Sequence, residues 1–233
     1  MKRLSVMVLV MVLGLVFTQD LHPKGFGIKS GANFANVYNV EDSLDYKTKT
    51  GFIVGGFYRF DLNNHLAIQP EAYFSMKGSR AVGEDTYSYY DSTVTTAYDY
   101  TLKLNYLEIP VLLKYKIPSG GKVKPNLFIG PSVAFKLSAR LTGSYKYQET
   151  YASSDYSGYY SYATSIDEEV DAVERTDFGL VFGAGLDIEM GSSSLVIEAR
   201  YNLGLTGLSK FADASDPGAK NAAFTLMMGI AFK

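Results

Sequence analysis

The 233-residue sequence contains no cysteine, no tryptophan and only two histidines. The absence of cysteine excludes disulfides, thiolate metal sites, cysteine nucleophiles and a lipidated N-terminal cysteine. A formal net charge of −2 and an isoelectric point near 5.7 give no reason to propose a nucleic-acid partner. The sequence also lacks long internal apolar runs, although 47% of its residues are hydrophobic. None approaches the roughly 18 residues that a membrane helix needs.

The N-terminus is the one exception. Lys2 and Arg3 precede a continuous apolar run from Leu4 to Phe17, which polar residues follow. A short charged region and a short apolar core are typical of a secretory signal peptide. We therefore expect residues 1–18 to be a signal peptide cleaved after Thr18. The alternative, a membrane-anchor helix, is disfavoured because the run is short.

Between Thr176 and Leu205, apolar residues alternate with glycine or charged residues on two successive arms. A period of two predicts β-strands, and these arms exceed the usual five or six residues. Strands of about ten residues with one apolar and one polar face are typical of lipid-embedded β-barrels. The apolar positions of the two arms are Phe178, Leu180, Phe182, Ala184, Leu186 and Ile188, then Leu195, Ile197, Ala199, Tyr201 and Leu203.

The remaining chain repeats this pattern, with short turns and long polar loops in alternation. Because all short turns then fall at one end and all long loops at the other, the pattern predicts an up-and-down barrel. We expect an all-β fold over residues 19–233: a transmembrane antiparallel barrel of eight strands, closed, filled by side chains and monomeric. The strands are expected near residues 25–35, 51–61, 65–77, 102–116, 125–141, 177–189, 195–203 and 221–232, and the long loops at 36–49, 78–101, 142–175 and 206–220.

Charged residues within the strands decide which face meets lipid. An arginine such as Arg200 at the membrane midplane, facing lipid, would cost about 2–4 kcal/mol, and Glu198 somewhat less. A one-residue register slip would expose every such charge together, exceeding the roughly 5–15 kcal/mol that stabilises most domains. We therefore expect these charges to point inward and to be paired. The others are Lys29, Arg59, Glu71, Glu108, Lys114 and Asp187.

A soluble barrel such as a lipocalin would reverse the two faces. Here the outward aromatic residues collect toward the strand ends, with aliphatic residues between them, as expected at the two interfaces of a bilayer. This favours a Gram-negative outer membrane, with its lipid and lipopolysaccharide as surroundings. The aromatic residues are Phe34, Phe74, Phe135, Phe178 and Phe224 at one end, and Tyr58, Phe60, Tyr115 and Phe232 at the other; the aliphatic belt includes Ile109, Val111, Ile129, Ile197 and Leu226.

Three prolines, Pro70, Pro110 and Pro131, fall inside predicted strands, where each removes one backbone donor from the ladder. Both edges of every strand in a closed barrel are paired. We therefore expect local β-bulges at these prolines.

Six stretches, spread in order along nearly the whole mature chain, carry a resemblance to a known family. They are GIKSGANFAN from Gly27, AIQPEAYFSMKG from Ala67, YLEIPVLLKY from Tyr106, LFIGPSVAF from Leu127, DFGLVFGAGLDI from Asp177 and EARYNLGLTGL from Glu198. With these stretches the sequence resembles the PorT-like outer-membrane β-barrel domain family. The resemblance implies a small outer-membrane barrel with no established catalytic residues, and prolines in the corresponding strands. The founding member is associated with a protein-secretion apparatus.

Nothing in the sequence predicts catalysis or a cofactor. Outer-membrane enzymes place a histidine-assisted nucleophile near the outer end, whereas His22 and His65 both belong to the short-turn end. We therefore expect no catalytic, cofactor-binding or metal-binding residues and no enzyme activity. An acidic cluster could bind a divalent cation, but it lacks the spacing of a calcium loop, and a solvated loop is the alternative. Its members are Asp167, Glu168, Glu169, Asp171 and Glu174.

The long loops are rich in tyrosine, serine and glycine, a composition that suits a recognition surface for a protein or glycan partner. The alternative is that these tyrosines form β-extensions of the barrel or pack among lipid headgroups. An accessory role in secretion or envelope assembly, with the short turn Pro118–Lys124 as its contact, is the second functional hypothesis. The tyrosines are Tyr87, Tyr89, Tyr90, Tyr98, Tyr145, Tyr147, Tyr151, Tyr156, Tyr159, Tyr160 and Tyr162.

Overall fold

The computed structural model describes residues 25–39, 45–152, 157–210 and 218–232. No helix within these ranges is long and apolar enough to cross a membrane. The predicted signal peptide, His22 and Tyr156 lie outside the described residues. The strands are β1 (Gly25–Tyr38), β2 (Asp45–Asp61), β3 (Leu66–Tyr89), β4 (Ser92–Lys116), β5 (Val123–Ala152), β6 (Ser157–Glu169), β7 (Thr176–Met190), β8 (Ser193–Gly204) and β9 (Lys220–Phe232).

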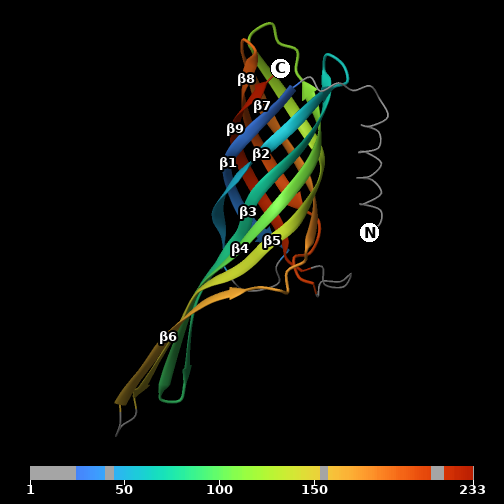
Figure 1. The fold of residues 1–233 in the computed structure, drawn as a ribbon. Coiled ribbons are helices and arrows are strands. Elements are labelled where there is room, and N and C mark those ends of the chain that lie inside the picture. Colours follow the sequence, from blue (N-terminus) through green and yellow to red (C-terminus); the bar gives the residue numbers. More distant parts are fainter. Residues whose placement is uncertain (1–24, 40–44, 153–156, 211–217, 233) are drawn as a thin grey trace.

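Eight of the strands close into an antiparallel ring. Strand β1 pairs with both β2 and β9, and the pairing of β4 with β5 completes the circuit. Strand β6 pairs only with β5 and stands outside the ring. Figure 1 shows the tilted strands of the barrel and β6 running along an extension that projects from it. The predicted eight-stranded, closed, all-β barrel is confirmed.

The alternation of side chains assigns the two faces as predicted. Glu198 and Arg200 are 1% and 2% exposed, whereas Ile197, which directly precedes Glu198 in β8, is 39% exposed. Since successive side chains of a strand point to opposite faces, the charged positions form the interior. The other predicted inward charges are also buried, apart from Arg59 at the short-turn end, which is half-buried: Lys29, Glu71, Glu108, Lys114 and Asp187.

The outer surface follows the predicted pattern at most positions. Phe34 and Phe224 are exposed at one end, and Tyr58 and Phe232 at the other. Val111 is an exception, because it is only 4% exposed. It lies opposite Pro70 in the β3–β4 register, and directly opposed side chains cover one another. Val111 shares the outward face with the exposed Leu113, as predicted for the aliphatic belt, but its own side chain is covered.

The predicted bulges at Pro70, Pro110 and Pro131 were also wrong. The β3–β4 and β4–β5 ladders skip a few rungs beside Pro70 and Pro110 and then resume in the same register. The β5–β7 ladder continues through Pro131 without a shift. A missing donor is thus met by a local gap in pairing, not by an inserted residue. The register shifts lie elsewhere, between Thr48 and Ile53 and between Asn105 and Tyr106.

Two of the predicted long loops are mostly strand, which confirms the alternative that their tyrosines form β-extensions of the barrel. Residues 78–101 continue β3 and β4, and most of residues 142–175 form the end of β5 and β6. Tyrosine and threonine favour strands, so their density in these segments was a strand signal. The four strands share rungs from Arg80–Thr101–Thr142–Asp167 to Tyr89–Ser92–Tyr151–Gly158. We call this four-stranded sheet, residues 80–101, 142–152 and 157–167, the arm; it projects from the barrel in Figure 1.

Glycines on the inner face make room for large interior side chains. A Cβ added at Gly229 would lie 2.0 Å from the carbonyl oxygen of Ile28 and 2.7 Å from Cγ of Lys29. At Gly120, in a short turn, an added Cβ would meet no heavy atom within 4 Å. Alanine substitutions at the two positions therefore separate the effect of interior packing, which only Gly229 would show, from the loss of glycine's backbone freedom, which both would share.

We predict that Gly229→Ala destabilises the barrel by about 1–3 kcal/mol, because the interior must shift to admit the methyl group. Gly120→Ala is the matched control and should change stability much less. The measurement is urea unfolding of the protein folded in lipid vesicles. Equal midpoints and slopes for the two variants would contradict the packing described here.

Candidate functional site

The barrel interior is organised around Lys29. Its Nζ donates to Oε1 of Glu71 at 2.6 Å and to Oε2 of Glu198 at 2.7 Å, and all three side chains are fully buried. The ammonium group also lies 4.6 Å from the ring centroid of Phe57. Strands β1, β3 and β8 each contribute one charge, so the contact ties together three separate parts of the ring.

Arg200 and Lys114 extend this contact into a cluster. Arg200 donates to both Glu71, at 2.8 Å, and Glu198. Lys114 bridges Glu198 and Asp187, each at 3.3 Å. The charges of three cations and three carboxylates thus balance. We call these six residues the central ion cluster. Buried charges are tolerated when each is paired, as here.

The cluster closes the lumen. Arg200, Lys29 and Lys114 are among the largest fully buried side chains of the described residues. The guanidinium of Arg200 also lies 5.3 Å from the ring centroid of Phe128 and 5.5 Å from that of Tyr73. An eight-stranded barrel has an interior just wide enough for side chains, and these side chains fill it. The predicted inward charges therefore form one packed polar core.

A second polar layer lies toward the arm. Lys77 pairs with Glu108 at 2.8 Å, and Asn221 donates to Asp177 at 2.8 Å. Lys77 and Asn221 were not singled out from the sequence. The alternation of each strand could have placed these two side chains on the inner face. Only the folded structure shows which residues they contact there.

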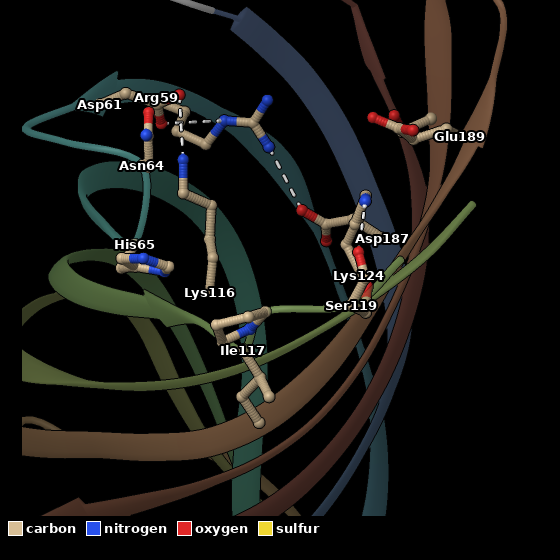
Figure 2. Close-up of a pocket in the computed structure, with 12 residues that line it drawn as sticks. Arg59, Asp61, Asn64, His65, Lys116, Ile117, Ser119, Lys124, Asp187 and Glu189 are labelled. Atoms are coloured by element: carbon tan, nitrogen blue, oxygen red, sulfur yellow. Dashed lines mark hydrogen bonds and ion pairs between the residues drawn. The ribbon is translucent and has the colours of Figure 1, made fainter. Parts of the chain in front are cut away.

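The short-turn end of the barrel opens into a polar cavity of about 720 Å³. Figure 2 shows its wall, where Arg59 reaches Asp187 at 3.2 Å and Lys116 reaches Asp61 at 3.0 Å. His65 lies at the same mouth, at the end where the sequence predicted it. Lys124 donates to the carbonyl oxygen of Ser119 at 3.0 Å, within the turn Pro118–Lys124. The mouth is thus a mixed-charge surface beside that turn.

The acidic cluster predicted at the end of β6 is dispersed. Strand alternation sends Glu168 to one face and Asp167 and Glu169 to the other, and Asp167 pairs with Arg140. Among the residues that the structure describes, no group of three or more histidine, aspartate or glutamate side chains could hold a metal ion. No catalytic residues were predicted from the sequence, so there are no such positions to compare with the structure.

The arm has two chemically different faces. Register pairs such as Tyr98↔Tyr145 and Tyr147↔Tyr162 lie on one side of the sheet. We call this side, which continues the inner face of the barrel, the tyrosine face. Its acidic residues are Asp85 and Glu149, and it carries no lysine or arginine. Its nine tyrosines are Tyr87, Tyr89, Tyr98, Tyr100, Tyr145, Tyr147, Tyr151, Tyr160 and Tyr162.

A single extra residue in β5 makes this alignment possible. Tyr106 pairs with Lys136 but Asn105 pairs with Ser138, which leaves Leu137 without a partner in β4. Such a β-bulge exchanges the faces of all following residues in the strand. If Leu137 were paired in the ladder instead of bulged out, the tyrosines of β5 would point away from those of β4. The bulge was not predicted, and no local sequence signal marks it.

The tyrosines contact one another both across and along the strands. The rings of Tyr147 and Tyr162 stack at 5.3 Å between centroids, and those of Tyr98 and Tyr100 at 6.0 Å. The hydroxyl of Tyr147 donates to Glu149 at 2.9 Å, and this bond raises the pKa of Tyr147 to about 12. The hydroxyl therefore stays protonated throughout the physiological pH range.

The opposite side of the arm carries mainly serine and threonine, and we call it the hydroxyl face. Thr86 and Thr95 lie 3.0 Å apart through their hydroxyls, and Arg80 pairs with Asp99. Hydrogen bonding to the guanidinium of Arg80 lowers the pKa of Asp99. Tyr159 is the one strand tyrosine on this face within the described arm.

The comparison with known families decides the class. The family described as outer membrane protein beta-barrel domain matches residues 17–210. The chain belongs to this family. It is accordingly an integral protein of the Gram-negative outer membrane, as predicted. No curated protein matches the sequence.

Several solved outer-membrane barrels are similar to the chain. Neisserial surface protein A is 14% identical with a TM-score of 0.45, covering 89% of this chain and 96% of its own. The attachment invasion locus protein of Yersinia pestis is 16% identical with a TM-score of 0.38, covering 91% and 100%. The N-terminal barrel domain of Pseudomonas aeruginosa OprF is 10% identical with a TM-score of 0.35, covering 88% and 96%.

Outer-membrane barrels place short turns in the periplasm and long connections outside the cell. Applied to this family member, the rule assigns the cavity beside Pro118–Lys124 to the periplasm. The same rule assigns the arm to the extracellular side. The central ion cluster lies between them, within the barrel.

We predict that Arg200→Leu costs about 3–5 kcal/mol of unfolding free energy, because it leaves Glu71 and Glu198 short of a buried partner. Arg80→Leu is the matched control: it removes an exposed arginine–aspartate pair of the arm and should change stability little. Urea unfolding in lipid vesicles measures both. Unchanged stability of Arg200→Leu would show that the cluster does not hold the barrel together.

Proposed function

We propose that this outer-membrane barrel is a non-enzymatic binding protein whose recognition element is the tyrosine face of the arm. The observation that carries the proposal is the alignment of nine tyrosines on one side of one sheet. Tyrosine supplies a large contact area with few rotatable bonds and a hydroxyl that hydrogen bonds at the rim. A sheet of paired strands presents these rings in a fixed arrangement, which lowers the entropy lost on binding.

The solvent exposure of tyrosine side chains on the tyrosine face supports the same proposal. Tyr87, Tyr160 and Tyr162 are 55%, 54% and 45% exposed, although they lie in regular strands. Val94, on the same face, is only 5% exposed, so the rings surround an apolar floor. Exposed aromatic side chains around a small apolar centre are typical of binding surfaces.

The charge of the tyrosine face limits the kinds of partner that it can bind. Asp85 and Glu149 lie among the tyrosines, and neither lysine nor arginine does. A polyanion would therefore meet repulsion, whereas the rings suit the apolar faces of neutral sugars and the cations of basic peptides. We propose a neutral glycan or a basic protein segment as the partner outside the cell.

A second candidate function is a part in secretion or envelope assembly. The finer resemblance to PorT-like barrels suggests it, and the polar cavity of the periplasmic mouth supports it with a specific surface. In this alternative the turn Pro118–Lys124 makes the functional contact, and the arm is dispensable.

The test compares two faces of the same arm. We expect the triple variant Tyr87→Ser, Tyr160→Ser, Tyr162→Ser to weaken partner binding more than tenfold, since truncated aromatic anchors dominate such losses. Tyr159→Ser, on the hydroxyl face, is the matched control and should bind normally. Partners are captured by crosslinking on intact cells, and their dissociation constants are then measured with purified protein.

Two results would contradict the proposal. One is equal loss of binding in the triple variant and in Tyr159→Ser. The other is survival of every partner in the triple variant together with its loss when Pro118–Lys124 is changed, which would establish the periplasmic alternative.

A further inference from the structure

The arm has two strand edges without partners among the described residues. Strand β6 pairs along its full length with β5 and with no other strand. Strand β3 pairs with β2 only up to Val82, so Gly83–Tyr89 pairs on one side alone, with β4. The backbone groups along such edges can pair with a further strand. The barrel itself has no such edge, because its ring is closed.

Neither edge carries the features that usually block pairing. Natural edge strands are protected by lysine, proline, bulges or very short length. Strand β6 has 13 residues, no lysine, no proline and no register shift, and its first charged residue is Asp167. The edge Gly83–Tyr89 also lacks lysine and proline, although it contains Glu84 and Asp85. Among the described residues both edges are therefore open to another strand, and Glu84 and Asp85 are the charges that a partner strand must tolerate.

The two edges span the same rungs of the arm and run in opposite directions. Gly83 shares a rung with Thr164, through Tyr98 and Tyr145. Tyr89 likewise shares a rung with Gly158. Strand β3 runs away from the barrel and β6 runs back toward it, as Figure 1 shows. Two copies side by side in one membrane would thus present these edges antiparallel and level with each other.

We propose that the β3 edge of one copy pairs with the β6 edge of a neighbouring copy, Gly83–Tyr89 against Gly158–Thr164. In the level register, Tyr87 lies opposite the partner's Tyr160, an aromatic pair that stabilises antiparallel strands. Glu84 and Asp85 meet no charged residue, because positions 158–164 of β6 are uncharged. The tyrosine faces of successive copies then form one continuous surface.

The geometry favours this pairing over that of identical edges. Two β6 strands in upright copies related by an axis along the membrane normal run in the same direction, so they cannot form an antiparallel ladder. Pairing of β3 with β6 is heterologous and repeats from copy to copy, giving chains or rings. This association departs from the monomer that the sequence led us to expect, and it uses the edges of the arm and not the closed barrel. The inference does not rest on ligand binding by the tyrosine face.

The test exploits the absence of cysteine from the chain. In the double variant Thr86→Cys, Ser161→Cys, the two cysteines lie three strand spacings apart within one copy, about 14 Å. A disulfide requires Cα atoms within roughly 7 Å, so it can form only between copies, where the two positions are opposed. After oxidation on intact cells, non-reducing electrophoresis should show dimers and a series of larger products.

The matched control is Thr86→Cys, Ser165→Cys, whose second cysteine lies on the same face but about 13 Å off the rung. It and each single variant should remain monomeric. A monomeric Thr86→Cys, Ser161→Cys protein whose barrel is folded, judged by its heat-dependent gel mobility, would overturn the proposal. So would equal crosslinking of Ser161→Cys alone, which would assign the contact to two β6 edges. The serine variants of the tyrosine face test the proposed function separately.

Discussion

The pairing of three cations with three carboxylates in the centre of the barrel is the constraint on which the rest of the structure depends. Lys29 contacts Glu71 and Glu198 at hydrogen-bond distance, with no exposure to solvent. A one-residue change of register would move these charges to the lipid-facing surface, where none would be paired. The cluster therefore fixes which residue faces inward on every strand that contributes to it, and it fills the space through which a solute would pass.

Because the interior is occupied, the chemistry available to the protein lies at its two ends. The inner face of β3, β4 and β5 continues past the membrane, and there charged residues give way to tyrosines. The bulge at Leu137 keeps the β5 tyrosines on that face, so one inserted residue decides the chemistry of the arm. At the other end the polar cavity is bounded by paired charges, with Arg59 held by Asp187.

The sequence predicted the barrel well because its signal is repeated and energetically strong. Alternation around Glu198 and Arg200 assigns the inner face without further information, since a lipid-exposed arginine is costly. The segments of the arm were assigned to loops, with β-extension of the barrel as the alternative, because tyrosine and serine are common in both exposed strands and recognition loops. The structure confirms the alternative. The prolines were misread because a closed ladder can lose a rung beside Pro70 without changing register. The tyrosine face depends on the bulge at Leu137, and a bulge is a property of two paired strands that a single sequence does not display.

The central claim is that the barrel is a closed support for surfaces at its ends and not a channel. Electrical recording across a planar lipid bilayer tests this claim most directly, with the purified protein inserted and both sides in the same salt solution. The account predicts no stepwise increase in conductance on insertion, because Arg200, Lys29 and Lys114 fill the interior. Reproducible conductance steps from folded, monomeric protein would contradict it.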